Sequence, residues 1–128
     1  MNKQCLFCEV YKNKTNIIFE NDYFYTRFDR FPVSPGHALV IPKRHVVSFL
    51  ELTKHEQIDF LPAIKETILV IQKIDLKKVY EDILNNPVNE KMEKFCKKIL
   101  SHKELNKKPD GYNIGVNEGI PAGRTIHH

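Results

Sequence analysis

The 128-residue sequence predicts a single α+β domain, residues 1–128, in which a central antiparallel sheet of about five strands packs against one main helix. Short runs rich in aromatic and β-branched residues, separated by turn residues, indicate strands early in the chain and again near its end. Between them, apolar residues recur at spacings of three and four, which indicates a helix with one apolar face. The hydrophobic content of 41% and charged content of 28% are typical of a globular protein.

The first strands are expected at residues 17–19 and 23–28, with a turn at residues 20–22 between them. Two short strands joined by so short a turn predict a β-hairpin. Asp29 follows the second strand and places a carboxylate at the edge of the sheet. An aspartate in such a position more commonly caps a turn than binds a ligand.

The next strand is expected at residues 37–42, after a loop at residues 32–36. Its nearly continuous apolar run predicts a strand buried on both faces. His37 and His45 bracket this strand and would lie about 26 Å apart in extended chain. They therefore cannot bind one ion unless the chain turns after Pro42, and a histidine at a strand end is more commonly structural than a ligand.

Residues 48–75 are expected to be helical. Thr53 is the candidate N-cap, with Glu56 three residues later completing a capping box. Pro62 predicts either a kink or a second start of the helix. One apolar stripe is expected to face the sheet, and it comprises Ile58, Leu61, Ile64, Ile68 and Ile71.

Residues 76–108 are rich in lysine and asparagine and predict a helical insertion on the surface of the domain. Residues 89–100 have apolar side chains at helical spacing, which predicts a second amphipathic helix. Cys96 lies among these apolar positions and is expected in the core. His102 and the lysines around it are expected at a solvated helix end.

The C-terminal stretch reads as a turn at Asp110-Gly111, a strand at residues 112–116, a loop, and a second strand that begins at Thr125. Gly119 and Gly123 allow the loop backbone to adopt positive φ and to approach a ligand closely. The second strand carries two histidines at its end. Such a hairpin is suited to binding an anionic group.

Cys5-Leu6-Phe7-Cys8 places two thiols three residues apart, which suits a tetrahedral zinc site or a redox pair. A redox pair would require a preceding strand and a first cysteine at a helix N-terminus. Because no strand precedes Cys5, zinc is favoured. Two incidental cysteines, one packed as a small hydrophobic residue, remain the alternative.

The net charge of +4 is spread along the chain rather than clustered, which argues against nucleic acid as a partner. No apolar run approaches the roughly 20 residues of a membrane span, so no membrane association is expected. Three cysteines are an odd number and do not form a secreted disulfide framework. A cytoplasmic location is therefore expected.

Four segments in this order resemble the histidine triad (HIT) family of nucleotide-binding hydrolases and transferases: residues 5–8, 35–45, 113–119 and 122–128. The resemblance covers nearly the whole chain except residues 76–108. In that family, three histidines alternate with apolar residues on one strand, and the middle histidine attacks the α-phosphate of a nucleotide. The glycine loop aligns His128 with the first of the three. The resemblance thus places the nucleophilic histidine beyond residue 128, with the C-terminal catalytic strand apparently missing from this chain.

The same resemblance implies a structural Zn²⁺ held by two cysteines and two histidines, namely Cys5, Cys8, His45 and His128. No metal is required for the covalent step. His37 would lie near the phosphate site and support the catalytic histidines instead of binding the metal.

The resemblance also implies nucleotide contacts, with Asp29 accepting hydrogen bonds from the ribose hydroxyls. Phe7, Val10 and Phe28 would line an apolar pocket for the base. Arg124 stands where the family usually has glutamine, and a guanidinium there is compatible with polyphosphate binding. The remaining phosphate contacts would come from Asn117, Gly123 and Thr125.

The function that the resemblance implies is hydrolysis or transfer at the α-phosphate of a dinucleoside polyphosphate or nucleotide conjugate, by a homodimer, through a nucleotidyl-histidine intermediate. Without the nucleophile, residues 1–128 by themselves are expected to be inactive. One alternative is a nucleotide-binding module without turnover. Another is a zinc-stabilised interaction domain, which the cysteine pair and the basic insertion alone would support.

Overall fold

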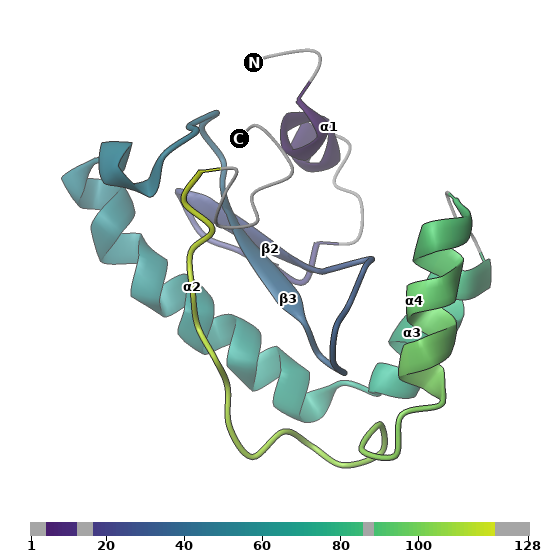
Figure 1. Cartoon of the computed structure of the whole chain (residues 1–128). Coiled ribbons are helices and arrows are strands. Elements are labelled where there is room, and N and C mark those ends of the chain that lie inside the picture. Colours follow the sequence, from purple (N-terminus) through teal and green to yellow (C-terminus); the bar gives the residue numbers. More distant parts are fainter. Residues whose placement is uncertain (1–4, 13–16, 86–88, 120–128) are drawn as a thin grey trace.

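The computed structural model describes residues 5–12, 17–85 and 89–119. In them, a three-stranded antiparallel sheet with the order β1-β2-β3 lies against a long helix, and two further helices pack at one end of that helix (Figure 1). The elements follow one another as α1 (Leu6–Lys12), β1 (Phe19–Glu20), β2 (Phe24–Phe28), β3 (Ala38–Pro42), the 3-10 helix η1 (Phe49–Glu51), α2 (Lys54–Lys73), α3 (Leu76–Asn85) and α4 (Glu90–Leu100).

The predicted hairpin is confirmed as β1 and β2, which pair antiparallel with Phe19 opposite Thr26. Asn21 forms the turn, because its side-chain oxygen accepts a hydrogen bond of 2.9 Å from the backbone N–H of Phe24. The strand at residues 37–42 is confirmed as β3, which pairs with β2. The expectation that β3 is buried on both faces is wrong, since among its five residues only Ile41 is buried. The reason is that β3 is an edge strand within the described residues.

The two faces of the sheet carry different contacts because side chains alternate along a strand. Phe24 packs against Phe60 of α2, with ring centroids 5.4 Å apart. Tyr25, on the opposite face, donates a hydrogen bond of 2.6 Å to the carbonyl oxygen of Phe7 in α1. Helix α1 and helix α2 therefore lie on opposite faces of the sheet.

Helix α2 begins with the predicted capping box. The Thr53 hydroxyl accepts from the Glu56 N–H at 3.2 Å, and the Glu56 carboxylate accepts from the Thr53 N–H at 2.8 Å. The helix runs without interruption from Lys54 to Lys73, so Pro62 does not restart it. No helix among the described residues is long and apolar enough to cross a membrane.

The predicted apolar stripe of α2 is only partly correct. Ile64 and Ile71 are buried, but Ile58 and Leu61 are each 69% exposed. The buried face is centred on Ala63 and Thr67, whose small size lets the helix approach the sheet. At 100° per residue, Leu61 projects about 160° away from Ala63.

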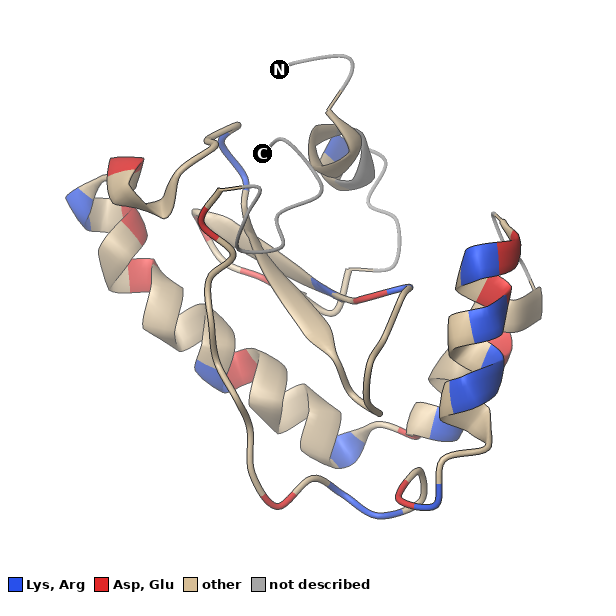
Figure 2. Ribbon diagram, in the orientation of Figure 1, with Lys and Arg blue, Asp and Glu red and all other residues tan. Residues whose placement is uncertain are grey.

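The insertion contributes to the core, so the expectation that it only decorates the surface is wrong. Helix α4 is the predicted second helix, capped by Asn89, whose side chain accepts from the Met92 N–H at 2.9 Å. Cys96 is fully buried, as predicted. Lysines and glutamates occupy the outer side of the pair (Figure 2). The core cluster that the insertion shares with the sheet and α2 comprises Phe28, Ile71, Leu76, Tyr80, Met92, Cys96, Ile99 and Leu105.

The strand expected at residues 112–116 is absent from the described part of the chain, and the sheet there has three strands instead of about five. Residues 111–118 instead cross α2 as an exposed extended segment (Figure 1). At one end Gln72 donates to the Pro109 carbonyl at 2.8 Å, and at the other Glu118 accepts from the Phe49 N–H at 2.9 Å. These hydrogen bonds hold the segment to α2 and η1 and not to the edge of β3. The second strand expected from Thr125 lies outside the described residues.

Candidate functional site

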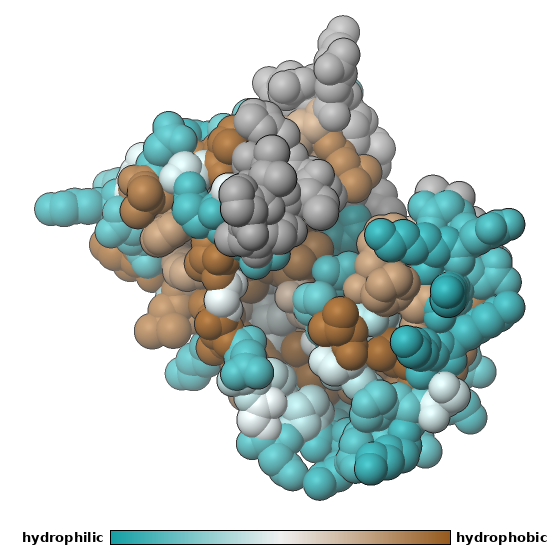
Figure 3. All heavy atoms as spheres, in the orientation of Figure 1, coloured by the Kyte–Doolittle hydropathy of each residue, from teal (hydrophilic) through white to brown (hydrophobic). Residues whose placement is uncertain are grey.

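A cavity of about 1280 Å³ is lined by residues from both faces of the sheet, from α1 and α2, from the insertion and from the 111–118 segment. Five residues singled out from the sequence line it: Phe7, Phe28, Asp29, His37 and Asn117. Apolar side chains border the hollow on the face shown in Figure 3, with the hydrophilic side chains of α4 to one side. A cavity of this size accommodates a ligand as large as a nucleotide or dinucleotide.

Asp29 and His37 face each other where β2 ends and β3 begins. The strand register pairs Phe28 with Ala38, so Asp29 and His37 are the next opposing residues. The Asp29 carboxylate lies 3.5 Å from Nε2 of His37. Because Nδ1 of His37 accepts from the Val33 N–H at 3.3 Å, the ring proton is on Nε2 and points to Asp29. The arrangement is an oriented imidazole beside a carboxylate.

Asp29 also has the structural role that is common at strand ends. Its other oxygen accepts from the Phe31 N–H at 2.8 Å and so caps the turn. A carboxylate offers about four acceptor positions, so these two contacts leave room for ligand hydroxyls. The turn-capping role and the ligand-binding role are thus compatible.

The residues expected to form a base pocket are not brought into one cluster. Phe28 packs in the core with Tyr80, with ring centroids 6.4 Å apart. Phe7 packs with Tyr25 and Ile41 on the other face of the sheet. The Val10 side chain lies outside what the structure describes.

Asn117 is exposed and borders the cavity from the 111–118 segment. Gly119 has a φ of 84°, which confirms the positive φ expected at the start of the glycine loop. The other predicted loop and strand residues, Gly123, Arg124, Thr125 and His128, lie outside the described residues.

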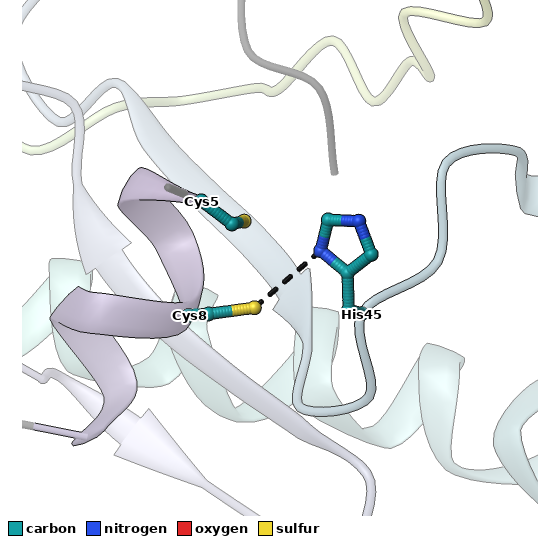
Figure 4. Close-up of side chains that lie close together, drawn as sticks. All are labelled: Cys5, Cys8 and His45. Carbon is teal, nitrogen blue, oxygen red and sulfur yellow. Dashed lines mark hydrogen bonds between the residues drawn. The ribbon is translucent and has the colours of Figure 1, made fainter. Parts of the chain in front are cut away.

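Cys5, Cys8 and His45 converge on one point beside α1 (Figure 4). The cysteines flank the first turn of α1 and are 5% and 1% exposed. The chain turns after β3 and brings His45 to them, whereas His37 stays at the cavity. The candidate ligand atoms all lie within 4.8 Å of one another, and Nδ1 of His45 is 3.4 Å from the Cys8 sulfur.

These distances fit a tetrahedral zinc ion. Zinc–sulfur and zinc–nitrogen bonds of about 2.3 and 2.0 Å at a tetrahedral angle separate the two ligand atoms by about 3.5 Å. Two buried thiols and an imidazole are also ligands that Zn²⁺ prefers. The donor set therefore fits zinc on both distance and chemistry.

An ion pair that the sequence analysis did not single out positions the turn that carries His45. Arg44 binds the Glu56 carboxylate through Nη2 at 2.9 Å and Nε at 3.2 Å, and Nη2 also donates to the Glu51 carbonyl. Glu56 is only 2% exposed. The Arg44 hydrogen bonds, together with those from Thr53, lower the pKa of Glu56 below its ordinary value of 4.5 against the opposing effect of burial. The capping box thereby links α2 to the turn that carries His45.

We expect Glu56→Gln to lower the free energy of unfolding by about 1–2 kcal/mol at neutral pH. The expected effect is small for a charged hydrogen bond because Arg44 is half exposed and solvent screens the interaction. Since the pKa of Glu56 is lower in the folded state, its stabilisation is complete above the unfolded value and is lost as pH falls below about 4.5. Urea unfolding of wild type and Glu56→Gln at neutral and acidic pH measures the stability difference and its pH dependence. Glu66→Gln, an exposed site on the same helix, is the control. Equal stability of wild type and Glu56→Gln at neutral pH would contradict the expectation.

Arg27 is also a residue that the sequence patterns did not indicate. It lies in β2, is 6% exposed and borders the cavity. Burial lowers the pKa of its guanidinium, neighbouring Arg30 lowers it further, and Tyr25 and Asp29 act in the opposite direction. Within residues 5–12, 17–85 and 89–119, no hydrogen bond or ion pair reaches its side chain.

Comparison with known proteins shows similarity along most of the chain. The HIT domain family profile matches residues 10–128. An uncharacterised HIT-like protein of Methanocaldococcus jannaschii is 25% identical over 126 residues, covering 97% of this chain and 72% of the relative. Adenosine 5′-monophosphoramidase of Schizosaccharomyces pombe is 35% identical over 69 residues, covering 52% of each protein. The asymmetrical bis(5′-nucleosyl)-tetraphosphatase of the same yeast is 27% identical over 97 residues, covering 76% of this chain and 36% of that enzyme.

Solved structures share the fold. A HIT family protein from Bacillus anthracis superposes with a TM-score of 0.65 at 20% identity, covering 100% of this chain and 70% of that one. A zinc-bound histidine triad family protein from Mycobacterium smegmatis gives a TM-score of 0.55 at 21% identity, covering 98% and 69%. Across these sequence relatives and structures, the chain spans from about a third to about three quarters of the length of the other protein.

Proposed function

The chain belongs to the HIT domain family, and from this premise we propose that its cavity binds a nucleotide for hydrolysis or transfer at the α-phosphate. The proposed substrate is a dinucleoside polyphosphate or a nucleotide conjugate. In support, two relatives bear the names adenosine 5′-monophosphoramidase and bis(5′-nucleosyl)-tetraphosphatase.

The single observation that carries the proposal is the Asp29–His37 pair at the wall of a nucleotide-sized cavity. We assign the ribose hydroxyls to Asp29, whose carboxylate keeps acceptor positions in the cavity. His37, oriented by the Val33 N–H and by Asp29, supports the reacting groups. Asn117 faces the phosphates together with three residues outside the described ranges, Gly123, Arg124 and Thr125.

In the proposed reaction, a histidine nitrogen attacks the α-phosphorus, and the bond to the leaving group breaks with the electron pair departing on that group. Water then attacks the nucleotidyl-histidine, breaks its P–N bond and regenerates the imidazole. Hydrogen-bond donors stabilise the charge that develops on the phosphoryl oxygens. In the HIT resemblance only His128 of residues 1–128 takes a triad position, so a polypeptide of these residues is proposed to bind nucleotide without turnover.

We further propose that Cys5, Cys8 and His45 hold a structural Zn²⁺, with His128 as the fourth ligand. The ion would supply a cross-link between α1 and the turn after β3, away from the Asp29–His37 pair. The convergence of two buried thiols and one imidazole supports this assignment.

We also propose an assembly state and a location. A homodimer would cover apolar side chains that the described chain leaves exposed, among them Ile58 and Leu61. A cytoplasmic location suits three cysteines that form no disulfide in the described residues.

The nucleotide site is tested by Asp29→Asn. We expect the affinity for a fluorescent nucleotide to fall about tenfold or more, because a neutral amide accepts hydroxyl hydrogen bonds less strongly than a carboxylate. The asparagine oxygen can still accept from the Phe31 N–H, so the turn should persist. Fluorescence anisotropy measures the affinity.

Asp82→Asn, at an exposed position on α3, is the matched control and should bind as wild type does. Unchanged affinity in Asp29→Asn would remove Asp29 from the site. Turnover by the 128-residue polypeptide would refute binding without catalysis.

A further inference from the structure

The guanidinium of Arg27 is buried at the cavity wall without a partner in the described part of the chain. Removing a cation from water without a compensating acceptor destabilises a fold, so such residues are usually paired. Its cross-strand neighbour on β3 is Leu39, whose side chain offers no acceptor. Asp29 acts on the guanidinium electrostatically, without a hydrogen bond or ion pair to it in the described residues. A buried, unpaired arginine that borders a cavity indicates that the cavity's ligand supplies the acceptor.

The position of Arg27 relative to Asp29 suggests which part of a nucleotide it meets. Residues two apart on a strand project to the same face and are separated by about 6.6 Å. The Asp29 N–H continues the strand pairing with a 2.9 Å hydrogen bond to the His37 carbonyl, so the alternation extends to Asp29. A nucleotide whose ribose hydroxyls bind Asp29 can therefore extend its base along β2 toward Arg27.

We infer that Arg27 is a specificity residue that hydrogen-bonds the acceptor edge of a guanine-type purine. This inference rests on the nucleotide-binding function proposed above. The planar fork of arginine matches two adjacent acceptors, and guanine presents O6 and N7 in that arrangement. Adenine presents a donor in place of O6, which would leave one guanidinium N–H buried and unsatisfied. The site thus discriminates by hydrogen bonding, which rejects a mismatched group more strongly than an apolar pocket does.

The test is calorimetric titration of GMP, IMP and AMP into the full chain. Wild type is expected to bind GMP and IMP, which share O6 and N7, about tenfold or more tightly than AMP. Arg27→Leu should reduce the GMP-to-AMP affinity ratio to about one and should raise the melting temperature, because an unpaired buried cation is replaced by an apolar side chain. Arg27→Gln keeps a polar side chain but lacks the two parallel donors of the guanidinium, so it should also lose the preference for GMP over AMP.

Arg30→Leu is the matched control, because it removes an equal charge from the same cavity wall. Its GMP-to-AMP ratio should equal that of wild type. Equal binding of GMP and AMP by wild type overturns the inference but leaves the nucleotide site intact. An equal loss of both nucleotides in Arg27→Leu also overturns it and assigns Arg27 to the phosphate. If none of the three nucleotides binds, the proposed function fails together with the inference.

Discussion

If the proposed zinc assignment is right, Cys5→Ser is expected to abolish zinc binding and to lower the melting temperature by roughly 10–20 °C. A ligand present at a thousand times its dissociation constant stabilises the folded state by about 4 kcal/mol, and structural zinc sites reach this regime. For a domain of this size, a loss of about 4 kcal/mol lowers the melting temperature by roughly 10–20 °C. Serine is a poor zinc ligand, and its hydroxyl would also be buried, because residue 5 is only 5% exposed.

Metal content and thermal unfolding of the same purified samples measure the effect. Wild type should hold one zinc per chain, and a chelator should lower its melting temperature to that of Cys5→Ser. Cys96→Ala provides the control, because Cys96 is buried in the core cluster that the insertion shares with the sheet and α2, to which Cys5, Cys8 and His45 do not belong. It should lose stability but retain zinc. One zinc per chain in purified Cys5→Ser would refute the assignment of Cys5.

Tyr80→Ala is expected to lower the free energy of unfolding by about 4 kcal/mol, a large share of the 5–15 kcal/mol typical of a domain. Tyr80 is fully buried in the core cluster between the insertion and the sheet. Removal of its ring leaves a cavity beside Phe28. Burial raises the pKa of the Tyr80 hydroxyl to about 12, so the side chain is neutral at physiological pH.

Tyr80→Phe separates the hydroxyl from the ring. The hydroxyl accepts from the buried Gly36 N–H at 2.8 Å, and the variant leaves that N–H unsatisfied at a cost of about 1–2 kcal/mol. Tyr112→Phe removes a hydroxyl at the exposed 111–118 segment, and its effect should stay below about 0.5 kcal/mol. Urea unfolding measures all three variants. A Tyr80→Ala protein as stable as wild type would show that the insertion is dispensable to the core.

Local patterns in the sequence were sufficient to predict the hairpin, strand β3 and the starts of α2 and α4. These features depend on contacts between residues close in the chain. The capping box of Thr53 and Glu56 is of this kind, and so is the short turn between β1 and β2, which falls at residues 21–23 and not at the predicted 20–22. The expected α+β class of the HIT family is likewise confirmed.

Sequence patterns failed where the outcome depends on which distant partner a segment contacts. The alternating residues 112–116 suit a strand, yet Gln72 and Phe49 hold this segment to α2 and η1. Ile58 and Leu61 fit a helical stripe, but the sheet covers the face of α2 centred on smaller residues. The insertion was expected on the surface because its lysines are conspicuous, whereas its core contacts come from Tyr80 and Cys96.

The candidate sites were also predicted only in part from the sequence. The sequence by itself determined the two thiols near the first turn of α1, three residues apart, and a carboxylate where β2 ends. Only the tertiary structure decided that His45, 37 residues after Cys8, meets those thiols while His37 meets Asp29. It also decided that Arg27 is buried at the cavity without a partner in the described residues. The physical reason is that spacing along the chain specifies neighbours within one turn or strand, whereas burial and pairing across the fold depend on how the elements pack.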